Sequence, residues 1–197
     1  YACEHFYVVT DEMEGLTKRP VLRDFDKGIY FKEDAGKMLV GWFEKDAIGC
    51  PMNKISEDFC FDQFEVDMDH IEPYLMGGME TFPEFGEAGI RTFFNGPESF
   101  TNDNLHLLGP TPEVDNFYVA CGLNSKGIGA AGGVGKIMAD WGIDGYPSGD
   151  VWECDVRRSH PVQRSQDYVE SRIPEALGHS YDMHWPFYQY QSARNIM

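Results

Sequence analysis

Residues 116–135 read NFYVACGLNSKGIGAAGGVG, and this stretch decides the expected fold. Its β-prone beginning at residues 116–121 runs directly into a glycine-containing turn, and a glycine-rich helix is expected over residues 128–143. The run DGYP at residues 144–147 ends the helix, since Gly and Pro are typical stop signals. A strand that leads through a turn into a helix indicates an α/β layer whose helix N-terminus can face an anion.

The run GIGAAG at residues 127–132 is a literal GxGxxG pattern in the required strand-turn-helix context. A nicotinamide-dinucleotide site also needs a second strand that ends in Asp or Glu about 20 residues further on. A turn at residues 144–149 occupies that place, so the dinucleotide interpretation is disfavoured. Two interpretations remain: glycines that let a helix pack closely, or a helix N-terminus that faces the edge of a flavin ring, which becomes negative on reduction.

The N-terminal half contains four short β-prone runs at residues 5–10, 20–23, 28–33 and 38–43, separated by turns. They predict part of an antiparallel sheet. Apolar residues at helical spacing predict a helix within residues 64–82, with Pro73 in its first turn or at a kink. Residues 90–96 read as a further strand.

The composition changes after Arg158. Residues 159–197 carry scattered prolines and aromatic residues, and they offer one short helix candidate at residues 165–173. We therefore expect a domain boundary near residue 158. Residues 1–158 would belong to one domain, and residues 159–197 would be the incomplete beginning of another.

Charge and cysteine content limit the function classes. The formal net charge of −17 argues against partners such as nucleic acid and anionic membrane surfaces, and no apolar run reaches the roughly 20 residues of a membrane span. The cysteine count is odd and lacks CxxC spacing, which indicates free thiols of a cytosolic or mitochondrial-matrix protein. His179 and His184 lack the further ligands that a metal site needs, so no metal is expected.

Several runs taken together resemble the dimethylglycine/sarcosine dehydrogenase family. They are NGPESFT at 95–101, LGP at 108–110, CGLNSKG at 121–127, AGGVG at 131–135, HFYVVT at 5–10, PVLRD at 20–24 and WECDVRR at 152–158. The resemblance follows the family's order over nearly the whole chain. It implies an α/β (α+β) fold of the FAD-dependent amine oxidoreductase type, related to glycine oxidase and D-amino-acid oxidase. Residues 1–158 would supply an antiparallel substrate sheet and a returning strand-helix of the FAD-binding domain, and residues 159–197 would begin the family's middle domain.

The resemblance also implies a function: FAD-dependent oxidative demethylation of a small N-methyl amine such as dimethylglycine or sarcosine. The substrate would lose a hydride to FAD, and the one-carbon unit would pass to tetrahydrofolate in a C-terminal domain that this chain lacks. The electron acceptor would be an electron-transfer flavoprotein or oxygen. The expected location is the bacterial cytoplasm or the mitochondrial matrix. The N-terminal FAD-fingerprint segment is expected upstream of His5, so the chain alone should bind FAD weakly at best.

The resemblance assigns site residues. His5 and Tyr30 match the positions of an active-site histidine and tyrosine beside the flavin: the histidine would tune the protonation of the substrate amine, and the tyrosine hydroxyl would orient the substrate. The segment expected against the flavin consists of Leu123, Asn124, Ser125, Lys126, Gly127 and Ile128.

The chain departs from the family pattern at three places. Asn102 and His106 stand where relatives often have Pro, which could loosen the loop beside the flavin. Gly129 occupies the place where monomeric sarcosine oxidases carry a carboxylate-binding Lys, and Lys126 is a candidate replacement. Gly127 is expected in a tight turn, with a positive φ angle as one option.

Two alternatives stay open. The first is a non-catalytic regulatory relative that resembles the regulatory subunit of pyruvate dehydrogenase phosphatase, to which ACEHFY at residues 2–7 and GYPS at residues 145–148 are also similar. The second is a flavin oxidase for another amine, such as proline or glycine, because the sequence does not fix the shape of the substrate pocket.

Overall fold

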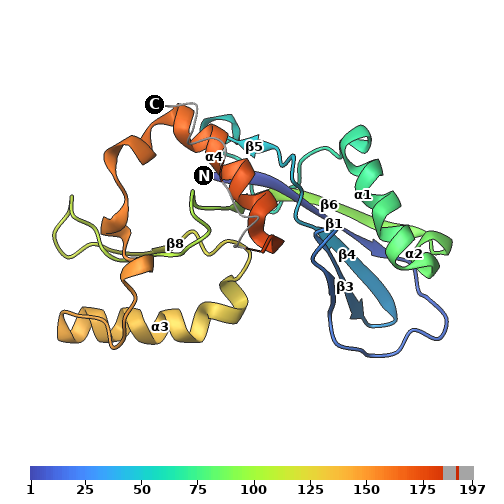
Figure 1. Ribbon diagram of the computed structural model, residues 1–197, viewed down its shortest axis with the longest axis horizontal. Coiled ribbons are helices and arrows are strands. Elements are labelled where there is room, and N and C mark those ends of the chain that lie inside the picture. The colour runs from blue at the N-terminus through green and yellow to red at the C-terminus, as the bar shows by residue number, and fades with distance from the viewer. Residues whose placement is uncertain (184–189, 191–197) are drawn as a thin grey trace.

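The computed structural model describes residues 1–183 and residue 190 of the 197-residue chain. A six-stranded antiparallel sheet forms one part of the molecule, and a small two-stranded sheet with a long helix lies beside it (Figure 1). The strands of the large sheet are β1 (Ala2–Thr10), β2 (Leu22–Asp24), β3 (Ile29–Asp34), β4 (Lys37–Trp42), β5 (Gly49–Cys50) and β6 (Ile90–Ser99).

Strand β1 is the centre of the large sheet. It pairs with β4 from Tyr7 to Val9 and with β6 along nearly its whole length, while β5 pairs with its first residues. The hairpin partners β3 and β2 extend the sheet beyond β4. Because side chains alternate between the two faces of a strand, consecutive residues of β1 have different surroundings.

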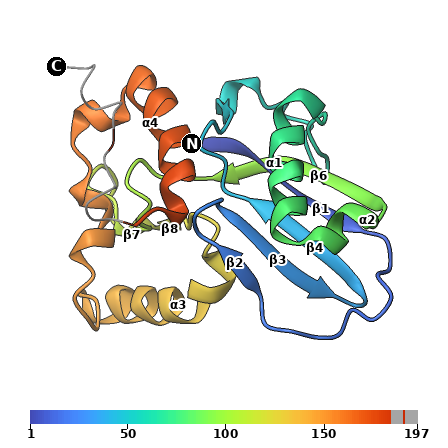
Figure 2. The ribbon, with the colours of Figure 1, turned by 45° about the vertical axis from the view of Figure 1, so that its right-hand side comes forward.

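Two helices cover one face of this sheet, α1 (Met68–Thr81) and α2 (Pro83–Glu87), as Figure 2 shows. The Asp67 carboxylate accepts hydrogen bonds from the first backbone N–H groups of α1, which defines the helix start. Pro73 lies inside the helix, in its second turn and not in its first. The core between sheet and helices consists of Phe6, Val8, Ile29, Phe31, Met38, Val40, Trp42, Ile71, Leu75 and Phe85.

The second part of the molecule contains β7 (Leu107–Pro110), β8 (Tyr118–Cys121) and α3 (Gly127–Asp144). Helix α3 ends at Gly145, whose left-handed φ of 81° suits a glycine C-cap. Only Trp141 of α3 is buried, and Ile128 and Ile143 are exposed. In both overall views the N-terminal end of α3 is the end nearer the large sheet (Figures 1 and 2).

The tail returns to the large sheet. The short helical turns η2 (Trp152–Cys154), η3 (Val156–Arg158) and η4 (Pro161–Arg164) lead to α4 (Gln166–Gly178) and η5 (His179–Tyr181). Ile173 and Leu177 of α4 pack in a second core cluster with Cys3, Ala47 and Phe100. This cluster joins the tail to the beginning of β1.

The expected fold class is confirmed, and so is each expected strand and helix among the described residues, with shifted boundaries. The strand expected at 90–96 continues to Ser99, and the tail helix expected at 165–173 continues to Gly178. The segments 184–189 and 191–197 of the expected second domain lie outside the described residues, and His184 lies with them. Within residues 1–183, no helix combines the length and the apolar character needed to cross a membrane.

Candidate active site

A row of paired residues crosses the large sheet on the face opposite α1. Tyr30 of β3 pairs with Gly41 of β4, and Gly41 pairs in turn with Tyr7 of β1. A Cβ atom at Gly41 would overlap the ring carbons and the hydroxyl of Tyr30. The missing side chain therefore creates the space in which the Tyr30 ring lies. Next along the row, the ring of Tyr7 stacks on that of Phe94, with centroids 4.7 Å apart.

His5 lies two residues before Tyr7 on the same strand, so its side chain points to the same face. The imidazole is buried, and its Nδ1 lies 3.2 Å from Oε2 of Glu44, a residue just beyond β4 that is only 1% exposed. The rings of Phe43 and Phe100 enclose the imidazole, with centroids at 5.0 and 6.1 Å. His5 Nε2 has no hydrogen-bond partner in the described part of the chain.

Two opposing effects act on the pKa of His5. Burial lowers it, but the hydrogen bond with Glu44 and the negative charges of Glu44 and Glu98 outweigh that effect, and the pKa lies above its ordinary value of 6.5. When the imidazole is neutral and its Nδ1–H donates to Glu44, the lone pair is on Nε2. The atom without a partner is then the proton-accepting atom.

Glu98 stands on the other side of that atom. It lies near the end of β6, and its Oε2 is 3.7 Å from His5 Nε2. The same oxygen accepts a hydrogen bond of 3.0 Å from the hydroxyl of Ser125. Burial also raises the pKa of Tyr30, and the negative charges of Glu98 and Glu44 add to the effect, so the Tyr30 hydroxyl stays protonated and can donate a hydrogen bond.

These side chains surround a hollow of about 290 Å³, which we name the tyrosine pocket. It is lined by His5, Tyr7, Tyr30, Phe94, Gly96, Pro97, Glu98 and Ser125. A second hollow of about 600 Å³, the loop pocket, is lined by Glu98, Ser99, Ala120, Cys121, Gly122, Leu123, Asn124, Ser125, Gly127 and Ile128. The two pockets share Glu98 and Ser125. This pair therefore forms the boundary between the sheet face and the start of α3.

The turn between β8 and α3 has an unusual backbone. Gly122, Asn124 and Ser125 have φ angles of 60°, 50° and 61°, in the left-handed region. The buried Asn124 side chain holds this conformation: its Oδ1 accepts from the backbone N–H of Thr101 at 2.8 Å, and its Nδ2 donates to the carbonyl of Gly122. Gly127 is outside the left-handed region, so the option of a positive φ there was wrong; the strain lies two residues earlier.

The loop before β7 is anchored by two arginines. Arg158 donates to both carboxylate oxygens of Asp103 at 2.9 Å, and it also donates to the carbonyl of His106 at 2.8 Å. Arg172 of α4 donates to the carbonyl of Asn102 at 3.1 Å. Bidentate arginine contacts of this kind fix a loop geometry, so charged hydrogen bonds hold this segment.

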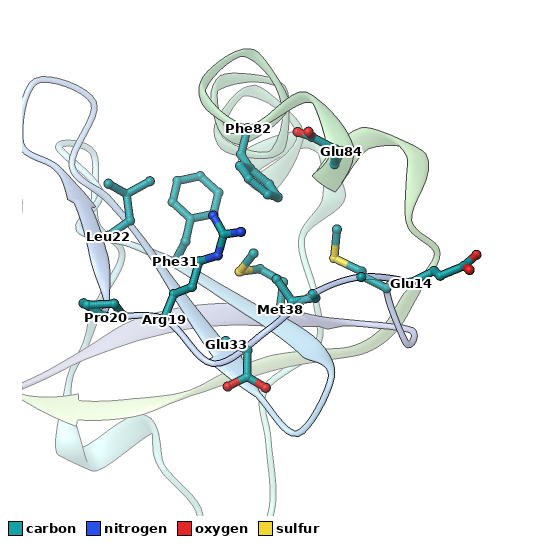
Figure 3. Close-up of a pocket in the computed structure, with 12 residues that line it drawn as sticks. Glu14, Arg19, Pro20, Leu22, Phe31, Glu33, Met38, Phe82 and Glu84 are labelled. Atoms are coloured by element: carbon teal, nitrogen blue, oxygen red, sulfur yellow. The ribbon is translucent and has the colours of Figure 1, made fainter.

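A third hollow, of about 460 Å³, lies on the other side of the β3–β4 hairpin, and we name it the methionine pocket. Figure 3 shows Phe31, Met38 and Phe82 gathered around it, with the carboxylates of Glu14 and Glu33 pointing away. The described residues that line it include no histidine, tyrosine or cysteine. The tyrosine pocket, in contrast, holds a buried histidine with an unpartnered ring nitrogen, and it is therefore the better candidate for proton-transfer chemistry.

The structure brings most of the expected site residues together. His5 and Tyr30 line the tyrosine pocket, and five of the six expected loop residues line the loop pocket. Lys126 is the exception: it is the exposed N-cap residue of α3 and lines neither pocket. No group of His, Cys, Asp and Glu side chains suited to a metal ion occurs among the residues that the structure describes.

Sequence reasoning missed Glu44, Glu98 and Gly41. Glu98 was visible in the run NGPESFT, but a carboxylate in a loop motif does not reveal which histidine it faces. Glu44 follows a strand in a stretch of ordinary composition, and its burial could not be expected from the pattern. The only available signal for Gly41 was a glycine inside a β-prone run, which often marks a close approach.

Comparisons with known proteins agree with this picture. Residues 1–141 match the family model "FAD dependent oxidoreductase", and residues 144–197 match "FAD dependent oxidoreductase central domain". The chain is 39% identical over its full length to 4-methylaminobutanoate oxidase (formaldehyde-forming) of Paenarthrobacter nicotinovorans, of which it spans 24%. It is 32% identical over 99% of its length to mitochondrial sarcosine dehydrogenase of Mus musculus, of which it spans 21%.

A relative whose name describes a regulatory subunit also matches. The mitochondrial pyruvate dehydrogenase phosphatase regulatory subunit of Mus musculus is 34% identical over the whole chain, which spans 22% of that protein. The chain thus spans about a quarter or less of these three relatives.

Among solved structures, L-proline dehydrogenase from P. horikoshii shares the fold with a TM-score of 0.67 at 20% identity, over 80% of this chain and 39% of that chain. Glycine oxidase from Geobacillus kaustophilus shares it with a TM-score of 0.63 at 21% identity, over 81% of this chain and 40% of that one. The family model that covers residues 1–141 accounts for most of the chain, including both pockets of the candidate site. The chain therefore belongs to the family of FAD-dependent oxidoreductases.

Proposed function

We propose that this chain forms the substrate side and the flavin-ring side of an enzyme that oxidatively demethylates a small N-methyl amino acid with FAD. One observation carries the proposal: the unpartnered Nε2 of the buried His5 faces a pocket that meets the loop pocket at Glu98 and Ser125. A substrate amine in the first pocket would lie beside a flat ring in the second.

The loop pocket fits a flavin ring. Helix α3 starts there without a side-chain cap and without an acidic residue in its first turn, so its first N–H groups are available to an electron-rich edge. A Cβ atom at Gly129 would meet nothing, and Ile128 is fully exposed. These features support a role for Leu123, Asn124, Ser125, Gly127 and Ile128 in holding the ring, with Asn124 contributing backbone only, because its side chain is committed to Thr101 and Gly122.

The chemistry divides between cofactor and chain. FAD, when bound, accepts the hydride from the carbon next to the amine nitrogen. Before this happens, the amine must be neutral, and His5 Nε2 is proposed to accept the proton that the ammonium group loses. The Tyr30 hydroxyl is proposed to donate a hydrogen bond to the substrate and to orient the reacting C–H bond.

The nature of the substrate and its partners belongs to the same proposal. Sarcosine, dimethylglycine and 4-methylaminobutanoate are the first candidates, because the similar proteins carry names that contain these compounds. Tetrahydrofolate is proposed as the one-carbon acceptor in the intact protein, and electron-transfer flavoprotein or oxygen as the electron acceptor. The bacterial cytoplasm or the mitochondrial matrix is the proposed location.

The division of the chain is proposed as well. We retain a boundary near residue 158, because the composition of the sequence changes there and Arg158 itself is bound to Asp103 of the loop before β7. The two family models meet earlier, between residues 141 and 144. Limited proteolysis of the protein at its full length distinguishes the two positions by the site of first cleavage.

The test of the proposed function is anaerobic mixing of the FAD-loaded, full-length protein with each candidate amine. Loss of the oxidised flavin absorbance, with formation of the demethylated amine, is the expected result. A protein that holds FAD but keeps its oxidised spectrum with every N-methyl amine contradicts the proposal. The alternative function, a regulatory subunit, is favoured by the 34% identity to that relative and predicts this negative result.

A further inference from the structure

We propose that Glu98 is the specificity-determining residue of the site: its carboxylate binds the positively charged nitrogen of the substrate and so selects cationic amines. The inference rests on the proposed function, because it concerns the substrate of the same site. It adds a residue that neither the sequence pattern nor the family resemblance assigns.

The position of Glu98 carries the first argument. Glu98 pairs with Cys3 in the β1–β6 register, so its side chain lies on the same sheet face as His5, which pairs with Gly96. The side chain is 32% exposed, between fully buried and free in solvent. The hydroxyl of Ser125 donates to its Oε2, and in the described part of the chain its Oε1 has no hydrogen bond. One carboxylate oxygen is held by the loop, and the other is available to a ligand.

The charges around the tyrosine pocket carry the second argument. The groups that face Glu98 are the imidazole of His5 with Glu44 behind it and the hydroxyls of Tyr7, Tyr30 and Ser125. No lysine or arginine lines the pocket among the described residues. When the imidazole is neutral, the described lining of the pocket has one carboxylate, that of Glu98, and no cation, and the Glu44 carboxylate lies behind His5. A ligand with a positive charge therefore gains an attraction that an uncharged ligand of the same shape lacks.

The buried Nε2 of His5 is an independent sign of a ligand. A nearly buried polar atom without a partner costs free energy unless a ligand satisfies it. Nε2 and the Glu98 carboxylate are 3.7 Å apart, so one amine nitrogen can lie within reach of both. When the N–H bond of the ammonium breaks and a bond from hydrogen to Nε2 forms, the positive charge moves to the imidazole. Glu98 faces a cation before and after this step.

The experiment compares two inert ligands of the same shape on the FAD-loaded, full-length protein. Trimethylammonioacetate carries a permanent positive charge on nitrogen, and 3,3-dimethylbutanoate has a neutral carbon in its place. Neither has an amine lone pair, so neither can be demethylated by hydride loss, and the dissociation constants can be measured by calorimetry. We expect the unchanged protein to bind the ammonium compound at least about tenfold more tightly than its carbon analogue.

Three variants test the role of Glu98. Glu98→Gln keeps the size and removes the charge, and the preference should fall to about onefold; Glu98→Asp keeps the charge and should keep most of the preference. Glu84→Gln is the matched control, because it removes one negative charge at the methionine pocket. It should leave the preference unchanged, since a distant exposed charge is screened.

Each result decides the inference. It is overturned if the unchanged protein shows no preference, if Glu98→Gln retains it, or if Glu84→Gln and Glu98→Gln reduce it equally. If Glu98→Gln does not bind FAD, Glu98→Asp with FAD bound decides the question. Loss of the preference for the ammonium compound in Glu98→Asp overturns the inference, and retention of that preference supports it. A preference that depends on Glu98, in a protein whose flavin no N-methyl amine reduces, supports the inference while the proposed function fails.

Discussion

The two faces of the large sheet are built by the same strands, but one face is packed in a core and the other lines a pocket. On one face, Phe6 stacks on Trp42 with centroids 5.1 Å apart, under α1. On the other face, His5 and Tyr7, the two neighbours of Phe6, line the tyrosine pocket. Strand propensity does not distinguish these residues, because each is compatible with a strand.

The difference lies in what covers each face. Helices α1 and α2 complete an apolar core on the first face (Figure 2). On the second face, α4 packs against the beginning of β1, and Tyr181 of η5 packs on Phe43, just beyond β4, with ring centroids 4.4 Å apart. The remainder stays open, and Gly41 leaves space there for the Tyr30 ring. The first face therefore carries the larger apolar core, and the second leaves room for a ligand.

The largest expected effect separates the faces by stability. Phe6→Ala removes a buried ring from the core and should lower the free energy of unfolding by about 3–5 kcal/mol. Phe61→Ala is the matched control, because Phe61 is fully exposed, and its effect should stay within about 0.5 kcal/mol. Urea unfolding of both variants measures the difference. Equal losses would mean that the apolar face is not the main source of stability.

Tyr30→Phe tests the open face by activity. The Tyr30 hydroxyl has no hydrogen-bond partner among the described residues, so its removal should change the free energy of unfolding little. It should lower transition-state stabilisation for amine oxidation by about 1–3 kcal/mol, the usual cost of a lost hydrogen bond to a charged group. Anaerobic stopped-flow reduction of the FAD-loaded, full-length protein measures this. An unchanged reduction rate would assign Tyr30 a structural role.

Gly41→Ala should act through the same ring. The new Cβ atom displaces Tyr30, and the reduction rate should fall by about tenfold, since small misplacements in a site are costly. In combination with Tyr30→Phe the effects should be less than additive. Gly77→Ala is the control, because a Cβ atom there meets only Ile29, at 3.7 Å. Full additivity of the two open-face variants would argue against a shared mechanism.

The smallest expected effect is a shift in pH dependence. Below the raised pKa of His5 the imidazole already holds a proton and cannot accept another, so the reduction rate should rise with pH through that pKa. Glu44→Gln removes the negative charge that raises this pKa, and the rising limb should move to lower pH, with a similar rate above it. Stopped-flow reduction across pH measures the limb. If the rising part of the pH profile stays at the same pH or moves to higher pH in Glu44→Gln, His5 is not the proton acceptor.

The sequence predicted the strands and helices of this fold well, and it predicted the conformation of the turns between them poorly. The β-prone run at residues 5–10 and the run at 116–135 gave the correct strands and helix, because local periodicity and turn chemistry determine such elements. The backbone conformation of the turn between β8 and α3 was harder to predict from the sequence. Its left-handed residues include Asn124 and Ser125, and Asn124 is held by Thr101, which is distant in the sequence.

The sequence by itself therefore determined the order of strands and helices, the family, and the expectation that His5 and Tyr30 belong to a site. Only the tertiary structure decided which groups complete that site. Glu44 meets His5 across 39 positions of the chain, and Ser125 meets Glu98 across 27. Such contacts depend on the register of β1 with β4 and β6 and on how the chain turns after each strand. No local pattern encodes these features, since they arise when distant segments pack.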